Sequence, residues 1–480
     1  MRPKVVDRPL IDPHSVGMVQ GPTKVGFAEL EHRGLMLERE QRFQEARDAF
    51  DDALKLEPGS QSCAEGRARV ALALQEDGAA RHCARALAFH DAHPERQLRM
   101  IQTAAVELGV AAISLIENYI RCNPENAAAH EMLSEIRAEW GAGDDFADSY
   151  RTALRDLPRS KPLLMSYWNT LSRAGRMKEA LRSMDKHRSL FQEDREFALL
   201  EVNVANHAGL AERAGELIDR LDDRPDALLA RGHHRLQTGK PQEAAQLFEA
   251  VVLAEPDNLS AWALLEIAWR VLGDQRHEWL IGQTGLYGAR ELALSQGQLD
   301  KIAAALRALH RTRAQPIGQS VRGGTQTAGQ LFLRSEPEIT MLTDALTAAI
   351  RQFVTALPAA DPRHPLLRHR NMGMAFGPSW SVRLTGGGYH AAHFHPNGIL
   401  SSACYIVLPE AVADPDGKAG WLEIGRPPPA LRLDLPPLAT FEPKPGRLVL
   451  FPSFLFHGTR PFSAGERLSV AFDLVPVPMD

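Results

Sequence analysis

Three histidines within six residues form the group in this chain that is best suited to metal chemistry. They are His390, His393 and His395, and they follow the glycine run 386–388. Neutral imidazole is the commonest metal ligand in proteins. On an extended chain, side chains alternate between two faces, so His393 and His395 point to one side and His390 to the other. We therefore predict that His393 and His395 bind a metal, and that His390 faces away as a supporting or surface residue.

A later segment supplies a candidate third ligand, His457, and an arginine ten residues after it, Arg467. Alternation along 467–474 places Arg467 and Ser469 on the same face as Ala471 and Asp473, pointing inward. A buried guanidinium needs an anionic partner because it cannot release its proton. Since no acidic residue nearby is an obvious partner, we predict that Arg467 receives a carboxylate that arrives with a small molecule.

The segments that must position these residues alternate with a period of two after Pro365. Short strands separated by Gly and Pro turns predict a β-sandwich or open barrel. Residues 337–356 have the helical period and predict a helix against the outside of this domain. The proline-rich stretch 426–445 predicts a long extended loop. The expected strands are 380–384, 403–408, 421–424, 447–451 and 467–474.

The first half of the chain repeats a helical pattern with a period of roughly 30 to 36 residues, which is typical of tetratricopeptide helix pairs. One copy places Ala46 four residues before Phe50, a distant copy places Ala244 four residues before Phe248, and a third contains Tyr150. We expect about seven units, with residues 60–115 fitting only loosely. Prolines are expected to end successive units because they cannot donate the next helical hydrogen bond. These are prolines 58, 94, 124, 158, 225 and 256.

The pattern predicts a multidomain α plus β protein with four segments. They are an N-terminal extension (1–25), a repeat array (26–275), a helical linker (276–312) and the β-domain (313–480). Repeat arrays stack into a superhelix with a concave groove. The groove predicts a peptide or protein partner; a spacer or a dimerisation surface is the alternative.

Composition limits the class of protein. The chain has 480 residues, of which 44% are hydrophobic and 24% charged, with a formal net charge of −5. These values predict a folded protein and show no bias toward nucleic acid or an anionic membrane. No apolar stretch is long enough to span a bilayer, and no secretory signal is visible. Four scattered cysteines without a CxxC motif favour reduced thiols in the cytoplasm.

As a set, the motifs of the β-domain resemble the double-stranded β-helix (jelly roll) of the Fe(II)/2-oxoglutarate-dependent oxygenases. They are most similar to the prolyl-hydroxylase-like branch, and to bacterial oxygenases that join tetratricopeptide repeats to this domain. The resemblance covers residues 370–476 well and 313–370 more weakly. The motifs that carry it are 389–397, 401–405, 420–423, 445–457 and 467–469.

The resemblance implies a role for individual residues. His393 and His457 match the two iron-binding histidines, and Arg467, assisted by Ser469, matches the arginine that pairs with the distal carboxylate of 2-oxoglutarate. Tyr405 sits where a tyrosine hydroxyl often meets that carboxylate. The implied cofactors are Fe(II), 2-oxoglutarate and O2, and the implied reaction is hydroxylation of a C–H bond. No catalytic residue beyond the metal ligands is implied.

One position departs from the family pattern. The usual site has two histidines and one carboxylate, and His395 stands where the carboxylate is expected. His395 binds the metal and completes a three-histidine set, or it does not bind and leaves a water or anion on iron, or the domain has lost catalysis. We expect the first, because imidazole suits iron and the side chain lies on the correct face.

We therefore expect a cytoplasmic oxygenase that hydroxylates a peptide or protein held by the repeats. Two alternatives stay open. One is a cupin-like protein that uses the histidines for another metal, which leaves Arg467 and Ser469 without a purpose. The other is a non-catalytic repeat scaffold with a degenerate oxygenase domain.

Overall fold

The computed structural model describes residues 26–477, except 41, 75, 77, 90–92, 219 and 413–416. The predicted N-terminal extension, 1–25, lies outside the described residues. The described chain forms two compact units, one ending at Leu108 and the other beginning at Gly109. No described helix combines the length and the apolar composition that crossing a bilayer requires. The cysteines, as predicted from their scatter, are free thiols.

The first unit is a set of packed helices whose core is organised by the repeat motif. Phe50 of α2 is fully buried. It lies against Gly34 of α1 and Gly66 of α3, where a methyl group on either glycine would overlap the ring. Close helix packing therefore depends on a small residue facing a large one. The helices are α1 (Phe27–Arg39), α2 (Phe43–Leu56), α3 (Gln61–Ala73), α4 (Ala79–Ala88) and α5 (Pro94–Leu108).

The second unit continues the array and repeats the same packing. Phe248 of α14 is fully buried against Gly232 of α13, the glycine sixteen residues before it, as Gly34 is before Phe50. The α-solenoid half of the predicted fold class is thus confirmed. The helices are α6 (Ile113–Cys122), α7 (Ala127–Glu139), α8 (Asp148–Asp156), α9 (Lys161–Arg173), α10 (Met177–His187), α11 (Arg195–His207), α12 (Ala211–Ile218), α13 (Pro225–Gln237), α14 (Pro241–Ala254) and α15 (Leu259–Leu272).

The prolines play two roles rather than the one predicted. Those at 58, 124, 158 and 256 lie in the turns that follow helices, as expected. Pro94 and Pro225, however, are the first residues of α5 and α13. Proline is favoured at the first helical position because its missing N–H would have no partner there. The prediction that these two prolines end repeat units was therefore wrong.

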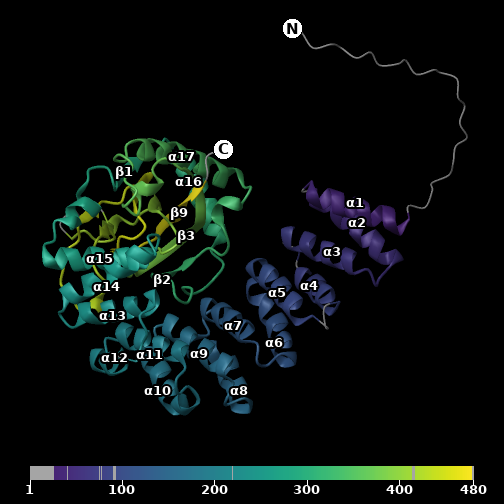
Figure 1. Ribbon diagram of the computed structural model, residues 1–480. Coiled ribbons are helices and arrows are strands. Elements are labelled where there is room, and N and C mark those ends of the chain that lie inside the picture. The colour runs from purple at the N-terminus through teal and green to yellow at the C-terminus, as the bar shows by residue number, and fades with distance from the viewer. Residues whose placement is uncertain are drawn as a thin grey trace, which may run out of the picture. The chain divides into compact units, whose positions relative to one another are not determined.

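The β-domain consists of two antiparallel sheets, which confirms the predicted fold class (Figure 1). Six strands follow the order β1-β7-β4-β9-β3-β2, and three follow β6-β5-β8. All five predicted strands are present. Their bounds are β1 (Gly288–Glu291), β2 (Val321–Gln326), β3 (Gly373–His390), β4 (Leu400–Val407), β5 (Leu422–Ile424), β6 (Ala439–Phe441), β7 (Arg447–Pro452), β8 (His457–Thr459) and β9 (Arg467–Val477).

Two helices cover the outer face of the larger sheet. They are α16 (Gln296–Leu309) and α17 (Pro337–Thr355), the latter close to the predicted helix 337–356. Their buried apolar residues join Leu468, Val470 and Phe472 of β9 in one hydrophobic cluster. Because side chains alternate along β9, packing of these three residues outward turns Arg467 and Ser469 toward the other sheet.

Two segments differ from their predictions. The segment predicted as a helical linker contains strand β1, which pairs with β7 (Gly288 opposite Leu450). The stretch predicted as an extended loop contains β6, which pairs with β5 (Leu422 opposite Phe441). Both strands are short, three or four residues long. They are strands because they pair with distant strands, not because polar and apolar residues alternate along them.

The last repeats and the β-domain share one hydrophobic core. Phe248 and Trp262 of the array belong to the same buried cluster as Tyr405 and Phe451 of the β-domain. In Figure 1, α13, α14 and α15 lie directly beside the sheets. The packing is therefore continuous across residue 275, where the sequence predicts the end of the array.

Hydrogen bonds also join the repeats to the β-domain. They lie at the C-terminal ends of four repeat helices, α7, α9, α13 and α15. The carbonyl of Glu139 (α7) accepts from the N–H groups of residues 313 and 314, and that of Arg173 (α9) from Gly318 N. Gln237 (α13) donates to the carbonyl of Ala430 at 2.6 Å, and Arg270 (α15) to that of Gly425 at 2.7 Å. These contacts anchor the loop before β2 and the proline-rich stretch.

Candidate metal centre

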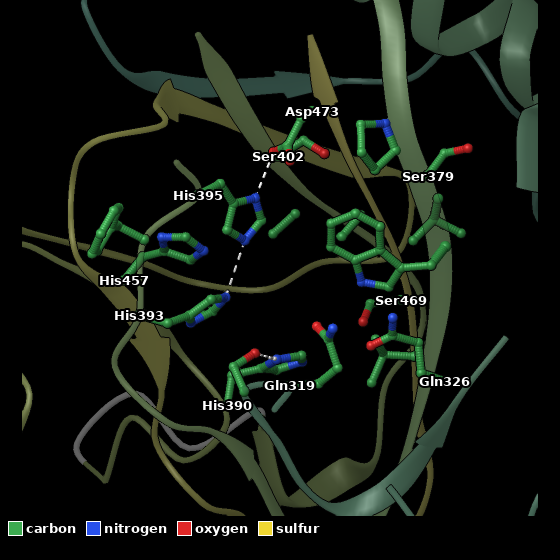
Figure 2. A pocket seen from close by; sticks show the side chains of 18 of the residues that line it. Gln319, Gln326, Ser379, His390, His393, His395, Ser402, His457, Ser469 and Asp473 are labelled. Carbon is green, nitrogen blue, oxygen red and sulfur yellow. Dashed lines mark hydrogen bonds and ion pairs between the residues drawn. The ribbon is translucent and has the colours of Figure 1, made fainter. Parts of the chain in front are cut away.

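A cavity of about 650 Å³ lies between the two sheets, and its lining comes from both of them. Figure 2 shows three imidazoles, those of His393, His395 and His457, gathered on one side of this cavity. Ser469 of β9 and Gln326 of β2 line the wall across from them. The residues predicted from two distant segments thus meet in one place.

A single backbone pairing brings two of the rings together. His393 N donates to His457 O at 3.0 Å, and His457 N donates to His393 O at 2.8 Å. Directly opposed residues of an antiparallel pair carry their side chains on the same face. The two ring centroids are consequently 4.2 Å apart. The backbone of His395 is held by a hydrogen bond from its main-chain N–H to the carbonyl of Ser453.

Each of the three rings has an acceptor for its Nδ1 proton. His393 Nδ1–H donates to the carbonyl of Ala391 at 2.9 Å, and His457 Nδ1–H to that of Leu455 at 3.0 Å. His395 Nδ1–H donates to Oδ1 of Asp473 at 2.5 Å. A neutral imidazole that donates from Nδ1 has a bare lone pair on Nε2. The surroundings therefore select the tautomer in which Nε2 is the ligand atom.

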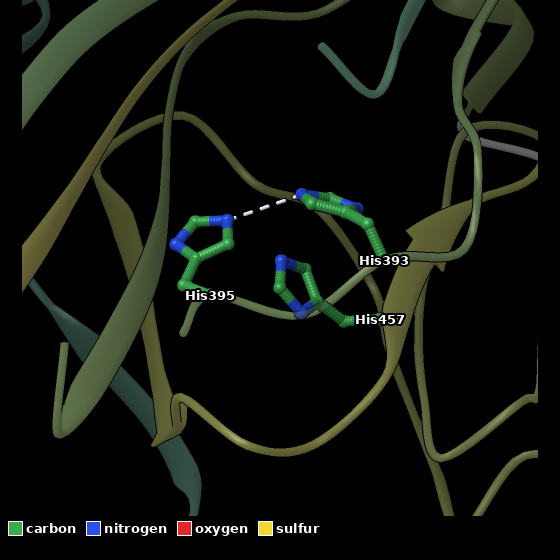
Figure 3. A group of neighbouring side chains, drawn as sticks. All are labelled: His393, His395 and His457. Atoms are coloured by element: carbon green, nitrogen blue, oxygen red, sulfur yellow. Dashed lines mark hydrogen bonds between the residues drawn. The ribbon is translucent and has the colours of Figure 1, made fainter. Parts of the chain in front are cut away.

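The three lone pairs converge on one point (Figure 3). The candidate ligand atoms of the three histidines all lie within 4.8 Å of one another, and Nε2 of His395 is 3.1 Å from Nε2 of His393. Two lone pairs at that distance repel unless a proton or a cation lies between them. Two nitrogens each about 2.1 Å from one ion, at right angles, would be about 3 Å apart. The donor set therefore fits a metal ion.

Burial keeps the rings of His393 and His457 in the neutral form that binds metals. It lowers the pKa of His393 to about 3, with a further decrease from the neighbouring His395. Burial also holds the pKa of His457 well below its ordinary value. A low pKa means that the ring does not have to lose a proton before it coordinates a metal near neutral pH.

The opposite end of the site contains a buried cation without an anion. Arg467 is 1% exposed, and burial lowers its pKa. Its Nη1 donates to the carbonyl of Gly420 at 2.8 Å, and its Nε is buried without a hydrogen-bond partner among the residues that the structure describes. No carboxylate among the described residues forms an ion pair with it. An internal acid partner would have contradicted the prediction for Arg467, and the described chain contains none.

The other two predicted residues lie beside Arg467. Ser469 lines the cavity two residues further along β9. Tyr405 is fully buried, with its ring centroid 5.0 Å from Cζ of Arg467, and its hydroxyl has no hydrogen-bond partner within the described part of the chain. Unsatisfied buried donors are rare in folded proteins and call for an explanation. An acceptor-rich ligand such as a carboxylate would satisfy both side chains, so the residues present fit 2-oxoglutarate as well as a metal.

The side chain of His390 does not face away, as the alternation pattern predicted, but it lies beside the three-histidine group and is not one of its members. The residue lines the same cavity, and its ring stacks near that of His393, with centroids 6.3 Å apart. The strand pattern failed here because β3 ends at His390, so alternation does not continue to His393. A hydrogen bond of 3.1 Å joins His390 Nδ1 to Ser320 Oγ. His390 thus lies in the wall next to the three-histidine group.

Sequence reasoning missed the residues that hold His395. Asp473 and Ser401 both contact its Nδ1, and the ring of Trp380 lies 5.6 Å away between centroids. Strand alternation placed Asp473 on the inward face, but gave no reason to connect it with a residue 78 positions earlier. That connection depends on the pairing of β4 with β9, which sets Ser401 opposite Asp473.

Comparison with known families agrees with this arrangement. Residues 378–473 match the family described as "Putative 2OG-Fe(II) oxygenase", and residues 229–274 match a tetratricopeptide repeat. A search of curated proteins gave no match.

Solved structures similar to this chain include proteins of both kinds. A Pseudomonas putida prolyl-4-hydroxylase is 18% identical, with 43% of this chain and 98% of that chain covered and a TM-score of 0.28. A tetratricopeptide repeat protein from Parabacteroides merdae is 14% identical, with 50% and 98% covered and a TM-score of 0.30. A 2OG-Fe(II) oxygenase family oxidoreductase from Burkholderia pseudomallei is 16% identical, with 40% and 84% covered and a TM-score of 0.27. Similarities this distant carry no argument about activity. On the two family matches, this chain contains a 2OG-Fe(II) oxygenase-family domain at residues 378–473 and a tetratricopeptide repeat at residues 229–274.

Proposed function

We propose that this protein is an Fe(II)- and 2-oxoglutarate-dependent oxygenase that hydroxylates a peptide or protein bound by its repeats. The observation that carries the proposal is the pair of unsatisfied groups in one cavity: three converging Nε2 lone pairs and a buried arginine without an acid. His393, His395 and His457 would hold the iron. Arg467, Ser469 and Tyr405 would hold the distal carboxylate of 2-oxoglutarate. The iron and its co-substrate supply the oxygen chemistry.

The residues of this chain contribute binding, orientation and a sheltered site. Arg467 would pair with a carboxylate through two parallel hydrogen bonds, which set the direction of the co-substrate as well as its affinity. The Nδ1 acceptors of the three histidines keep each ring from rotating. The outward packing of Leu468 and Val470 holds β9, and with it Arg467, in place.

The border between the repeats and the cavity supports a macromolecular substrate. Gly318, which lines the cavity, donates its N–H to the carbonyl of Arg173 at the end of α9. Its neighbours Gln319 and Ser320 also line the cavity. A short loop therefore connects the ends of the repeat helices with the cavity wall, and a chain lying along the repeats would be close to the metal site.

The decisive experiment measures succinate released from 2-oxoglutarate with Fe(II). We expect turnover by the native chain and its loss in Arg467→Ala and His457→Ala. Arg383→Ala is the matched control, because this arginine pairs with Glu466 outside the cavity wall. Metal binding without consumption of 2-oxoglutarate would favour the cupin-like alternative, and absence of metal binding would favour the scaffold.

A second experiment addresses the substrate. Proteins captured by the His457→Ala chain should gain one oxygen atom when treated with the native enzyme.

A further inference from the structure

Asp473 is a buried carboxylate whose only ion-pairing partner in the described chain is the imidazole of His395. Its exposed fraction is 4%, and it contacts Nδ1 of His395 at 2.5 Å. No Lys or Arg among the described residues forms an ion pair with it. An uncompensated buried charge is strongly destabilising. An ionised Asp473 is therefore stable only with a positive charge near it, and His395 stands between it and the converging lone pairs.

The hydroxyl of Ser401 gives this contact a direction. Ser401 Oγ lies 2.7 Å from Oδ1 of Asp473 and 2.9 Å from Oγ of Ser453. A hydroxyl has one proton and an ionised carboxylate can only accept, so Ser401 donates to Asp473. Asp473 thus accepts from Ser401 and from Nδ1–H of His395. Both of these protons point toward Asp473, which leaves the negative charge directed at His395 and Nε2 directed at the cavity.

The backbone at Gly398 lies close to Asp473. A Cβ atom on Gly398 would lie 2.8 Å from Cβ of Asp473 and 2.8 Å from Oγ of Ser453. Such distances are shorter than van der Waals contact. Ser401 is held opposite Asp473 by the pairing of β4 with β9. The carboxylate is therefore packed on one side by Gly398 and directed on the other at His395.

We propose that Asp473 is a positioning residue that supplies, through His395, the negative charge that a carboxylate ligand supplies directly in the usual iron site. The inference rests on the metal binding proposed above. In the usual site, a divalent ion with one carboxylate ligand carries a net charge of +1. With three neutral imidazole ligands, the net charge of the centre would stay at +2. Asp473 lowers it to +1, with the imidazole of His395 lying between the carboxylate and the ion. A carboxylate that accepts from Nδ1–H also makes Nε2 a stronger donor.

The test measures Co(II) affinity by calorimetry, and the visible spectrum of bound Co(II), in the full chain. The variant D473N keeps the shape and an acceptor oxygen but removes the charge. We expect it to bind Co(II) about 10- to 100-fold more weakly than the native protein. The matched control is Glu466→Gln, which removes one carboxylate that pairs with Arg307 and Arg383 outside the cavity wall. It should bind as the native protein does.

The double variant His395→Asp with D473N places a carboxylate at the ligand position itself. We expect it to regain part of the affinity that D473N loses, with a changed Co(II) spectrum because a nitrogen ligand is replaced by oxygen. If D473N does not fold, Gly398→Ala serves instead. It keeps every charge but displaces Asp473, and it should weaken Co(II) binding in the same direction.

The outcomes separate the two proposals. Native affinity and an unchanged spectrum in D473N, or in Gly398→Ala where that replaces it, would overturn the role of Asp473 while leaving the metal site intact. Failure of the native protein to bind Co(II), Ni(II) or Fe(II) would overturn the proposed function and this inference with it.

Discussion

The first and last repeats of the array contain the same packing motif in different surroundings. In both, an alanine precedes a buried phenylalanine by four residues, and a glycine precedes that phenylalanine by sixteen. Phe50 lies against Gly34 and Gly66, within the unit that ends at Leu108. Phe248 lies against Gly232, and its cluster extends into the β-domain.

The difference shows that one helix-pair motif serves two purposes. Around Phe50 it closes a helix pair on its neighbours. Around Phe248 it also supports the β-domain, because the same cluster contains Tyr405, which contacts Arg467. The last repeats are thus part of the structure that holds the site.

The largest expected effect comes from deleting the two phenylalanine rings. Phe248→Ala and Phe50→Ala should each destabilise their surroundings by about 3–5 kcal/mol. For Phe248→Ala, hydrogen exchange should accelerate in α13–α15 and also in β5 and β7, and Co(II) affinity should fall. For Phe50→Ala, faster exchange should be confined to residues up to 108. Equal spread of faster exchange in both variants would show that the comparison is mistaken.

A smaller effect is expected from the arginine that links α15 to the β-domain. Arg270 donates to the carbonyls of Gly425 and Pro436. A hydrogen bond from a charged group contributes about 1.5–3 kcal/mol, and the bond to Pro436 adds little to this because it is exposed. Arg270→Ala should therefore increase exchange in 425–438 and lower the midpoint of unfolding of the second unit. Arg69 of the first unit pairs with Glu38 at a surface position, and Arg69→Ala should change neither measurement. A loss of the same size in Arg69→Ala would remove the distinction between the units.

The smallest expected effect is a dependence of folding stability on pH. Burial lowers the pKa of His310, which bonds to Thr325 and Ser381, to about 4. The unfolded chain binds this proton near pH 6.5 and the folded chain only near pH 4, so stability falls as pH decreases through that window. Chemical unfolding at pH 7 and pH 5 should show this loss in the native protein and less of it in His310→Asn. An identical pH dependence in the variant would exclude His310 as its source.

Elements with a strong local pattern could be predicted from the sequence. Helical periodicity of 3.6 residues predicted the repeat motif at Phe50 and Phe248 and the helix 337–355. Alternation with a period of two predicted five of the strands. The short strands β1 and β6 could not be predicted, because they exist only through pairing with distant strands. The two prolines at 94 and 225 were misread because proline occurs both after a helix and at its first position.

For the site, residue types and spacing determined which side chains are candidates: His393, His395 and His457 for a metal, and Arg467 for a carboxylate. Tertiary structure alone decided how they are used. The bond pair between His393 and His457 sets two rings side by side, and the pairing of β4 with β9 brings Asp473 to His395. The physical reason is that imidazoles and carboxylates act only at hydrogen-bonding distance, and chain pairing, not sequence order, sets that distance.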